Sequence, residues 1–84
     1  MEDIEAKVKE VLLEILDIKE EEIIPTARFV DDLKATSIDL VEIVAALQNT
    51  FDVDIDEAQV VRMQTVQDSV DCFREAIAVR RRAS

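Results

Sequence analysis

Apolar residues recur at spacings of three and four along most of this chain, the period of α-helices that bury one face. In the first stretch they fall at Ile4, Val8, Val11, Leu12, Ile15 and Leu16. Asp3 is placed to cap that helix. Further stretches run from Ser37 to Thr50, over residues 57–62, and from a second capping residue, Thr65, to about Val79. The chain is therefore predicted to be all-α, a small helical bundle.

The segment between the first two helices, residues 17–35, breaks this period and holds the single proline, Pro25. A connection of this length is uncommon in a compact domain and is usually either functional or disordered. Its apolar residues indicate that it packs on the core: Ile18, Ile23, Ile24, Phe29, Val30 and Leu33. We therefore expect a long ordered loop between helices one and two.

The second helix is expected to start at Ser37, with Thr36 as its N-cap and Asp39 completing a capping box. At about 100° per residue its apolar residues make two adjacent faces. The first face consists of Leu40, Ile43, Val44 and Leu47, and the second of Ile38, Val41 and Ala45. One face can pack inward, which makes the second a candidate partner surface. The alternative is a helix that is buried nearly all round.

The charge of the chain is strongly asymmetric. Its 84 residues include 10 Lys and Arg against 20 Asp and Glu, and three of the basic residues are Arg80, Arg81 and Arg82. Residues 1–79 therefore carry seven basic and 20 acidic side chains, a net of −13. Such a body repels nucleic acid and anionic membranes and is attracted to basic protein surfaces. Solubility alone would also explain the acids.

Length and composition limit the number of domains and the kinds of segment that the chain can contain. Its length suits one domain, residues 1–79, followed by a basic tail at residues 80–84. No charged-then-apolar leader opens the chain, and no apolar run reaches the roughly 20 residues that cross a bilayer. We therefore expect a cytoplasmic monomer with no nucleic-acid or membrane partner.

Residue types restrict the chemistry. Histidine is absent, which excludes a Ser-His-Asp triad and the commonest general base, so the protein is not expected to be an enzyme. The single Cys72 cannot form an internal disulfide and fits a core position. An EF-hand-like start at Asp52 fails at Glu57 and Met63, so no metal site is expected. Ser37, at a helix start, is either a modification acceptor or only a capping residue.

Several segments together match one known family in type and spacing: Val8-Lys9, residues 29–33, Ser37-Ile38-Asp39 with Val41-Glu42, Ala46-Leu47, Phe51-Asp52 and residues 65–67. Over nearly its whole length the chain resembles bacterial acyl carrier proteins. The resemblance implies a four-helix bundle with three longer helices and a short third helix. It also implies that a phosphopantetheinyl transferase, or holo-synthase, attaches 4'-phosphopantetheine to Ser37. The thiol of that arm would carry acyl groups between enzymes of fatty acid, lipid or related biosynthesis.

The resemblance also implies two sets of contact residues. Basic docking surfaces of acyl-handling enzymes would meet the second helix at Ile38, Asp39, Val41, Glu42 and Ala45. The acyl chain would enter the interior near Phe29, Leu40, Leu47, Ile55, Val60 and Met63.

The chain departs from the family pattern at several positions. Lys34 replaces a glycine, Thr36 an aspartate, Gln48 and Asn49 two acids, and apolar residues occupy positions 60 and 61. These departures favour a specialised paralogue with dedicated enzymes. Two alternatives remain open, a peptidyl or aminoacyl carrier protein and an unmodified helical interaction module.

Overall fold

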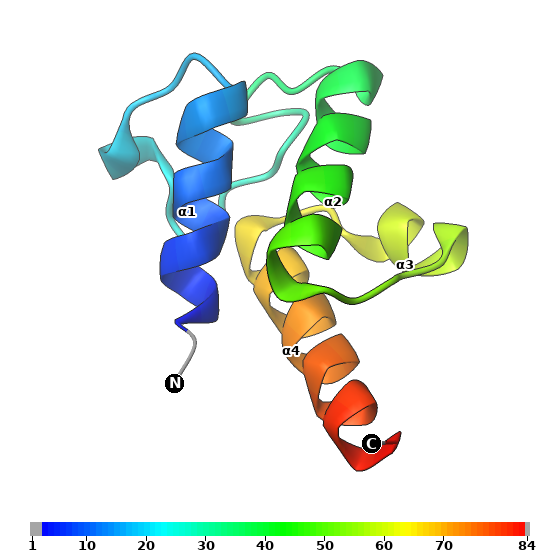
Figure 1. Ribbon diagram of the computed structural model, residues 1–84. Helices are drawn as coiled ribbons and strands as arrows, with labels where there is room; N and C mark the ends of the chain where they lie inside the picture. Colours follow the sequence, from blue (N-terminus) through cyan, green and yellow to red (C-terminus); the bar gives the residue numbers. More distant parts are fainter. Residues whose placement is uncertain (1–2, 84) are drawn as a thin grey trace.

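A computed structural model describes residues 3–83, without the side chain of Ala83. Over this range it contains four α-helices, as predicted, with one 3₁₀ turn, η1 (Glu20–Glu22), in the long loop. The helices are α1 (Ile4–Ile15), α2 (Ser37–Phe51), α3 (Glu57–Arg62) and α4 (Val66–Ala83). Helices α1 and α2 lie side by side, α4 contacts both, and the short α3 stands at the edge of the bundle (Figure 1).

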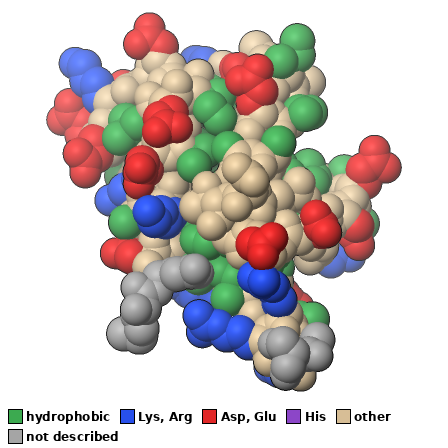
Figure 2. All heavy atoms as spheres, viewed as in Figure 1, with side chains coloured by type: hydrophobic (Ala, Val, Ile, Leu, Met, Phe, Trp, Pro, Cys, Tyr) green, Lys and Arg blue, Asp and Glu red, His purple; other side chains and the backbone are tan. Residues whose placement is uncertain are grey.

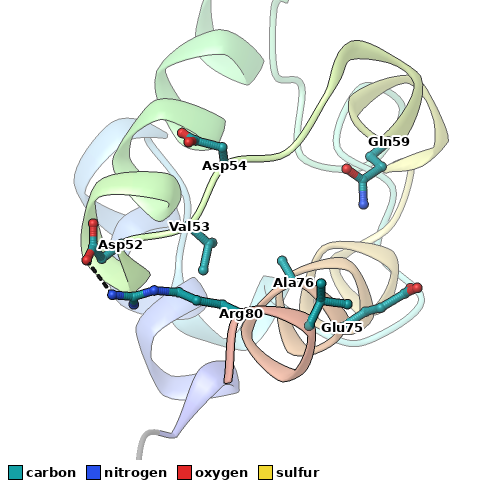
Figure 3. A pocket seen from close by; sticks show the side chains of 8 residues that line it. Asp52, Val53, Asp54, Gln59, Glu75, Ala76 and Arg80 are labelled. Carbon is teal, nitrogen blue, oxygen red and sulfur yellow. Dashed lines mark hydrogen bonds and ion pairs between the residues drawn. The ribbon is translucent and has the colours of Figure 1, made fainter. Parts of the chain in front are cut away.

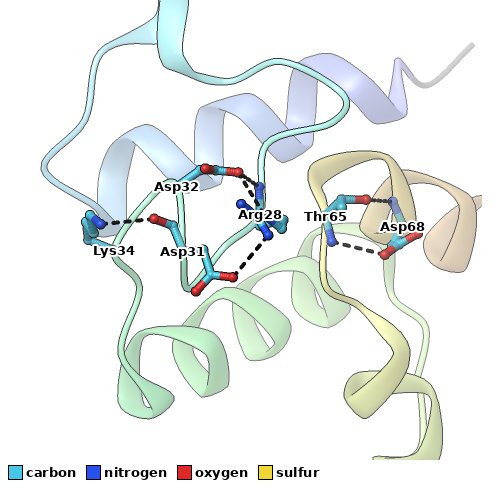
Figure 4. Close-up of polar contacts among 6 residues, drawn as sticks. All are labelled: Arg28, Asp31, Asp32, Lys34, Thr65 and Asp68. Atoms are coloured by element: carbon cyan, nitrogen blue, oxygen red, sulfur yellow. Dashed lines mark hydrogen bonds and ion pairs between the residues drawn. The ribbon is translucent and has the colours of Figure 1, made fainter.

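The predicted capping residues start the helices as expected. Asp3 accepts a hydrogen bond from a first-turn N–H of α1. At α2, Thr36 Oγ1 accepts from the Asp39 N–H at 3.1 Å, and Asp39 Oδ2 accepts from the Thr36 N–H at 3.0 Å. At α4, Thr65 Oγ1 accepts from the Asp68 N–H at 3.1 Å (Figure 4). These bonds satisfy N–H groups that a helix start leaves without partners.

The core is formed by the inner faces of α1, α2 and α4 together with the loop. Rings from two of these helices, Phe51 and Phe73, lie with centroids 5.8 Å apart. The loop contributes five buried side chains: Ile23, Ala27, Phe29, Leu33 and Ala35. The long loop between α1 and α2 is therefore ordered by burial, as predicted.

Two loop residues that we expected in the core are instead exposed. Ile24 is 52% exposed and Val30 is 57% exposed, so their predicted burial is wrong. Each directly follows a buried residue, Ile23 and Phe29 respectively. Consecutive side chains of a non-helical backbone tend to point to opposite sides, so only one of each pair faces the core.

The loop is fastened to the start of α4 by an isolated antiparallel bridge between Arg28 and Thr65. The Phe29 N–H donates to the carbonyl oxygen of Gln64 at 2.9 Å. These bonds fix the depth of Phe29, which is almost completely buried.

Lys34 has a left-handed backbone conformation, with φ at 60°. A residue with a Cβ atom in this region costs roughly 1–2 kcal/mol, which glycine avoids. The resemblance places a glycine at this position, and the conformation explains that preference. In this chain Lys34 Nζ donates to the carbonyl oxygen of Asp31 at 3.0 Å, a bond that glycine lacks (Figure 4).

Helix α4 continues four residues beyond its expected end at Val79. Arg80, Arg81 and Arg82 therefore lie in its last turn, where positive charge is favourable because of the helix dipole. The expected basic tail is helical through Ala83, and Ser84 lies outside the described residues. Over residues 3–83, no helix combines the length and the apolar character needed to span a bilayer.

Candidate functional site

Ser37 is exposed and is the first residue of α2. The other serine among residues 3–83, Ser69, is fully buried, and its hydroxyl donates to the Val66 carbonyl oxygen at 2.6 Å. Of the serines that the structure describes, Ser37 alone therefore offers its hydroxyl to a second protein.

The surroundings of Ser37 fit a phosphate ester. The capping box uses the N–H groups of Thr36 and Asp39, whereas helix geometry gives those of Ser37 and Ile38 no intrahelical acceptor. These groups and the helix dipole make the start of α2 favourable for an anion. A phosphodiester on the Ser37 hydroxyl would therefore be held by the first turn of α2.

A groove of about 420 Å³ lies beside Ser37, between α2, α3 and the loop. Its lining includes four of the six residues predicted to contact an acyl chain: Phe29, Leu40, Val60 and Met63. The other two do not line it. Leu47 is fully buried in the core, and Ile55 is half-buried against it. The groove thus brings an apolar wall next to the exposed serine.

The groove also has a polar edge that the sequence did not indicate, formed by Arg28, Asp31 and Gln64. Arg28 is held by ion pairs from Nη1 to Asp31 Oδ2 at 3.4 Å and from Nε to Asp32 Oδ2 at 3.3 Å (Figure 4). No spacing in this non-periodic loop predicts which side chains meet. The position of Arg28 follows instead from the bridge to α4.

Asp32 anchors this edge through the backbone. Its Oδ2 accepts the Arg28 N–H at 2.8 Å as well as the Arg28 side chain. The backbone hydrogen bond, and after it the side-chain hydrogen bond, lower the pKa of Asp32 below its usual value. Asp32 therefore holds Arg28 most firmly when its carboxyl group is ionised.

Helix α2 presents the two faces that its sequence predicts. Ile43 and Leu47 are buried, whereas Ile38 and Val41 are 71% and 67% exposed and Ala45 is also exposed. The interpretation of a helix buried nearly all round is therefore wrong. Green apolar side chains protrude beside red acidic ones near the upper end of α2 (Figure 2).

A second groove of about 420 Å³ lies away from Ser37, between the α2–α3 connection, α3 and α4. Asp54, Glu75 and Arg80 line it (Figure 3). Among residues 3–83, no cluster of three or more His, Cys, Asp or Glu side chains is placed to hold a metal ion. Cys72 is half-buried, and burial raises the pKa of its thiol, with Glu75 and then Asp56 adding to the effect. Its thiol therefore stays protonated at neutral pH and is a poor nucleophile.

The fold and the site together define a class of protein, a small helical domain in which the accessible serine of residues 3–83 lies at a helix start beside an apolar groove. Comparison with known proteins agrees with this class. Residues 6–73 match a protein family described as "Phosphopantetheine attachment site".

Similar curated proteins include the acyl carrier protein of Buchnera aphidicola subsp. Acyrthosiphon pisum (strain Tuc7). It is 44% identical over 75 residues, which are 89% of this chain and 94% of the relative. The acyl carrier protein of Buchnera aphidicola subsp. Schizaphis graminum (strain Sg) is 41% identical over 71 residues, 84% of this chain and 90% of the relative.

The chain belongs to the acyl carrier protein family. Members of this family carry acyl groups on a 4'-phosphopantetheine arm, and at the level of the family this is the function of the chain. They are carriers rather than catalysts, and they act together with acyl-handling enzymes.

Proposed function

We propose that Ser37 is the residue of this chain that bears 4'-phosphopantetheine. The observation that carries the proposal is its exposed position at the start of α2, next to the apolar groove. When attached, the arm supplies a thiol that carries the acyl group as a thioester. The Ser37 hydroxyl provides the ester oxygen, and the first-turn N–H groups of α2 stabilise the phosphate charge.

The groove beside Ser37 receives the first part of the acyl chain. Leu40 and Val60 are half-buried in its walls, and Phe29 and Met63 are buried beneath them. Each methylene moved from water into such surroundings contributes about 0.8 kcal/mol. Leu47 and Ile55 do not line the open groove. They would contact the acyl chain only if a longer acyl chain pushed apart the side chains that pack between them and the groove.

The exposed face of α2 is the docking face for enzymes. Ile38, Val41 and Ala45 supply apolar contact, and Asp39 and Glu42 supply the charge that attracts basic residues. Its partners are a phosphopantetheinyl transferase, which modifies the serine, and acyl-handling enzymes with basic docking surfaces. Nucleic acid and membranes are not partners, because the charge of residues 1–79 repels both.

Within the family the chain is a specialised member. Thr36 replaces an acid next to the serine, and Gln48 and Asn49 replace acids near the end of α2. Enzymes that bind acidic side chains at these positions would bind this protein weakly and act on it slowly. We further propose that residues 1–79 form the carrier domain, that the protein is a cytoplasmic monomer, and that it has no catalytic activity of its own.

The experiment is an intact-mass measurement after incubation with coenzyme A, magnesium and a broad-specificity phosphopantetheinyl transferase. The wild-type chain should gain the mass of one phosphopantetheine, and a folded Ser37→Ala variant should gain nothing. No gain by the folded wild-type chain, with a transferase shown to be active on another carrier, would favour an unmodified interaction module.

A further inference from the structure

The polar edge of the groove beside Ser37 comes from the same two segments that form its buried floor. In the loop, the exposed Arg28 directly precedes Phe29, which is 1% exposed. Before α4, Met63, which is 7% exposed, directly precedes the exposed Gln64. All four residues line the groove. Each segment thus supplies one apolar side chain to the floor and one polar side chain to the edge.

Backbone hydrogen bonds hold these two segments together. The Phe29 N–H donates to the carbonyl oxygen of Gln64 at 2.9 Å, and the Gln64 N–H donates to Asp68 Oδ2 at 3.1 Å. Arg28 is paired with Thr65 in the bridge to α4. The two polar side chains therefore extend from backbone that is fixed beside the groove.

The polar edge keeps hydrogen-bonding groups that the fold does not use. Within residues 3–83, the side-chain amide of Gln64 makes no hydrogen bond, so it offers both a donor and an acceptor. The ion pairs of Arg28 use Nε and Nη1, and its guanidinium carries further N–H donors on Nη2 (Figure 4). A polar group that enters the groove can therefore exchange its bonds to water for bonds to these side chains.

The charges at the polar edge balance. Arg28 and Lys34 offset Asp31 and Asp32, and the contacts among these four residues place them together (Figure 4). Residues 1–79 as a whole carry a net charge of −13. A carboxylate therefore gains no net attraction here, whereas a hydroxyl or carbonyl group gains hydrogen bonds.

We propose that the groove holds acyl chains that are apolar at the far end and carry a neutral hydroxyl or carbonyl substituent close to the thioester. The inference rests on the proposed function, since it names the cargo of the arm on Ser37. The apolar end contacts Phe29 and Met63, and the substituent stays at the exposed edge, where Gln64 and Arg28 bind it. In a groove lined by apolar side chains alone, the same substituent would lose its bonds to water without replacement. Gln64 is thus a determinant of cargo choice.

The test compares melting temperatures of the full chain loaded with decanoyl or with 3-hydroxydecanoyl groups. A broad-specificity phosphopantetheinyl transferase attaches each group from the corresponding acyl-coenzyme A. The 3-hydroxydecanoyl form of the wild type should melt at least as high as the decanoyl form. Gln64→Met keeps the length of the side chain and removes its amide. It should lower the melting temperature of the 3-hydroxydecanoyl form by roughly 4–8 °C, the shift expected from one hydrogen bond in a domain of this size, and should not lower that of the decanoyl form.

Gln67→Met is the matched control, because Gln67 lies outside the groove and its amide donates to Asp71. It should change the two loaded forms equally. A wild-type 3-hydroxydecanoyl form that melts below the decanoyl form would overturn the proposal, as would a loss specific to this form that is equal in Gln64→Met and Gln67→Met. A malonyl-loaded chain that melts above the acetyl-loaded chain would also overturn it, since the edge would then favour an anion.

The intact mass of each sample distinguishes failure of this inference from failure of the proposed function. A folded chain that takes up no acyl-phosphopantetheine refutes modification at Ser37, and the cargo inference with it. A loaded chain that lacks the expected differences refutes the cargo inference alone.

Discussion

Arg80 Nη2 donates a hydrogen bond to Asp52 Oδ2 at 2.8 Å, and this contact joins the last turn of α4 to the end of α2 (Figure 3). Arg80 Nη1 also donates to the carbonyl oxygen of Phe51 at 3.5 Å. Asp52 is the C-cap of α2 and has a left-handed backbone, with φ at 54°. Arg80 thus donates a hydrogen bond to a backbone carbonyl at the C-terminus of α2 and forms an ion pair with its C-cap residue, Asp52.

Arg80→Ala should lower the melting temperature slightly. The two side chains are 55% and 83% exposed, so the ion pair contributes less than about 1 kcal/mol, equivalent to at most about 8 °C for a domain of this size. The matched control is Arg82→Ala, which removes the same charge from the same helix turn. Thermal unfolding in dilute buffer should separate the two variants, and added salt should reduce the difference. Identical melting in dilute buffer would contradict a stabilising role for the Arg80–Asp52 contact.

Asp32→Asn should destabilise the protein in a pH-dependent manner. Hydrogen bonds from Arg28 hold the pKa of Asp32 below its unfolded value, so its contribution is complete above about pH 4 and disappears as the pH falls through the folded pKa. The difference in melting temperature between wild type and variant should therefore be largest at neutral pH and shrink in acid.

Asp31→Asn is the control for Asp32, because it removes a neighbouring charge that also pairs with Arg28. Its carboxylate lacks the 2.8 Å bond from the Arg28 N–H that Asp32 accepts. A melting difference for Asp32→Asn that stays constant from neutral pH into acid would be incompatible with this account of Asp32.

Thr36→Asp should increase modification by a holo-synthase that contacts acids beside the serine. Asp is as good an N-cap as Thr, so the variant should keep the capping bond to the Asp39 N–H while adding a negative charge. We expect the kcat/KM for phosphopantetheine transfer to rise several-fold, mainly through KM. Thr36→Ser retains the cap without the charge and should behave like the wild type. An equal gain in both variants would show that the cap, not the charge, limits the reaction.

Acyl cargo should stabilise the fold. With about 0.8 kcal/mol for each buried methylene, the melting temperature of the loaded protein should rise with chain length until the groove is filled. Val60→Phe narrows the groove and should reduce this gain without a comparable loss of stability in the unloaded protein. Equal melting temperatures for the unloaded form and for short and medium acyl forms would show that the groove does not hold the cargo.

Local rules predicted the helices well. The predicted capping box of α2 depends on two residues three positions apart, Thr36 and Asp39, and the two faces of α2 depend on the helical period, so both can be predicted from the sequence. The loop follows no period, which is why the exposure of Ile24 and Val30 was missed. The length of α4 was underestimated because Arg80, Arg81 and Arg82 interrupt the apolar period in its last turn. The contact of Arg80 with Asp52 spans 28 positions, so no local pattern predicts it.

The site was predictable in part. The position of Ser37 could be predicted from the capping residues at the start of α2, and the exposed face of α2 from the helical period. The groove brings together residues from α2, α3 and the loop, so its membership depends on the bridge from Arg28 to Thr65, which no local pattern shows. The sequence shows apolar residues at positions 60 and 61, but only the structure places Val60 and Val61 in the groove beside Ser37.

The most direct measurement is the location of the arm by mass spectrometry of tryptic peptides from the modified protein. Cleavage after Lys34 and Arg62 isolates residues 35–62, in which Ser37 is the single serine, whereas Ser69 falls in residues 63–74. The account predicts that the phosphopantetheine mass is found on residues 35–62 and that fragmentation places it on Ser37. Its presence on residues 63–74, or on Thr36 within residues 35–62, would contradict the account.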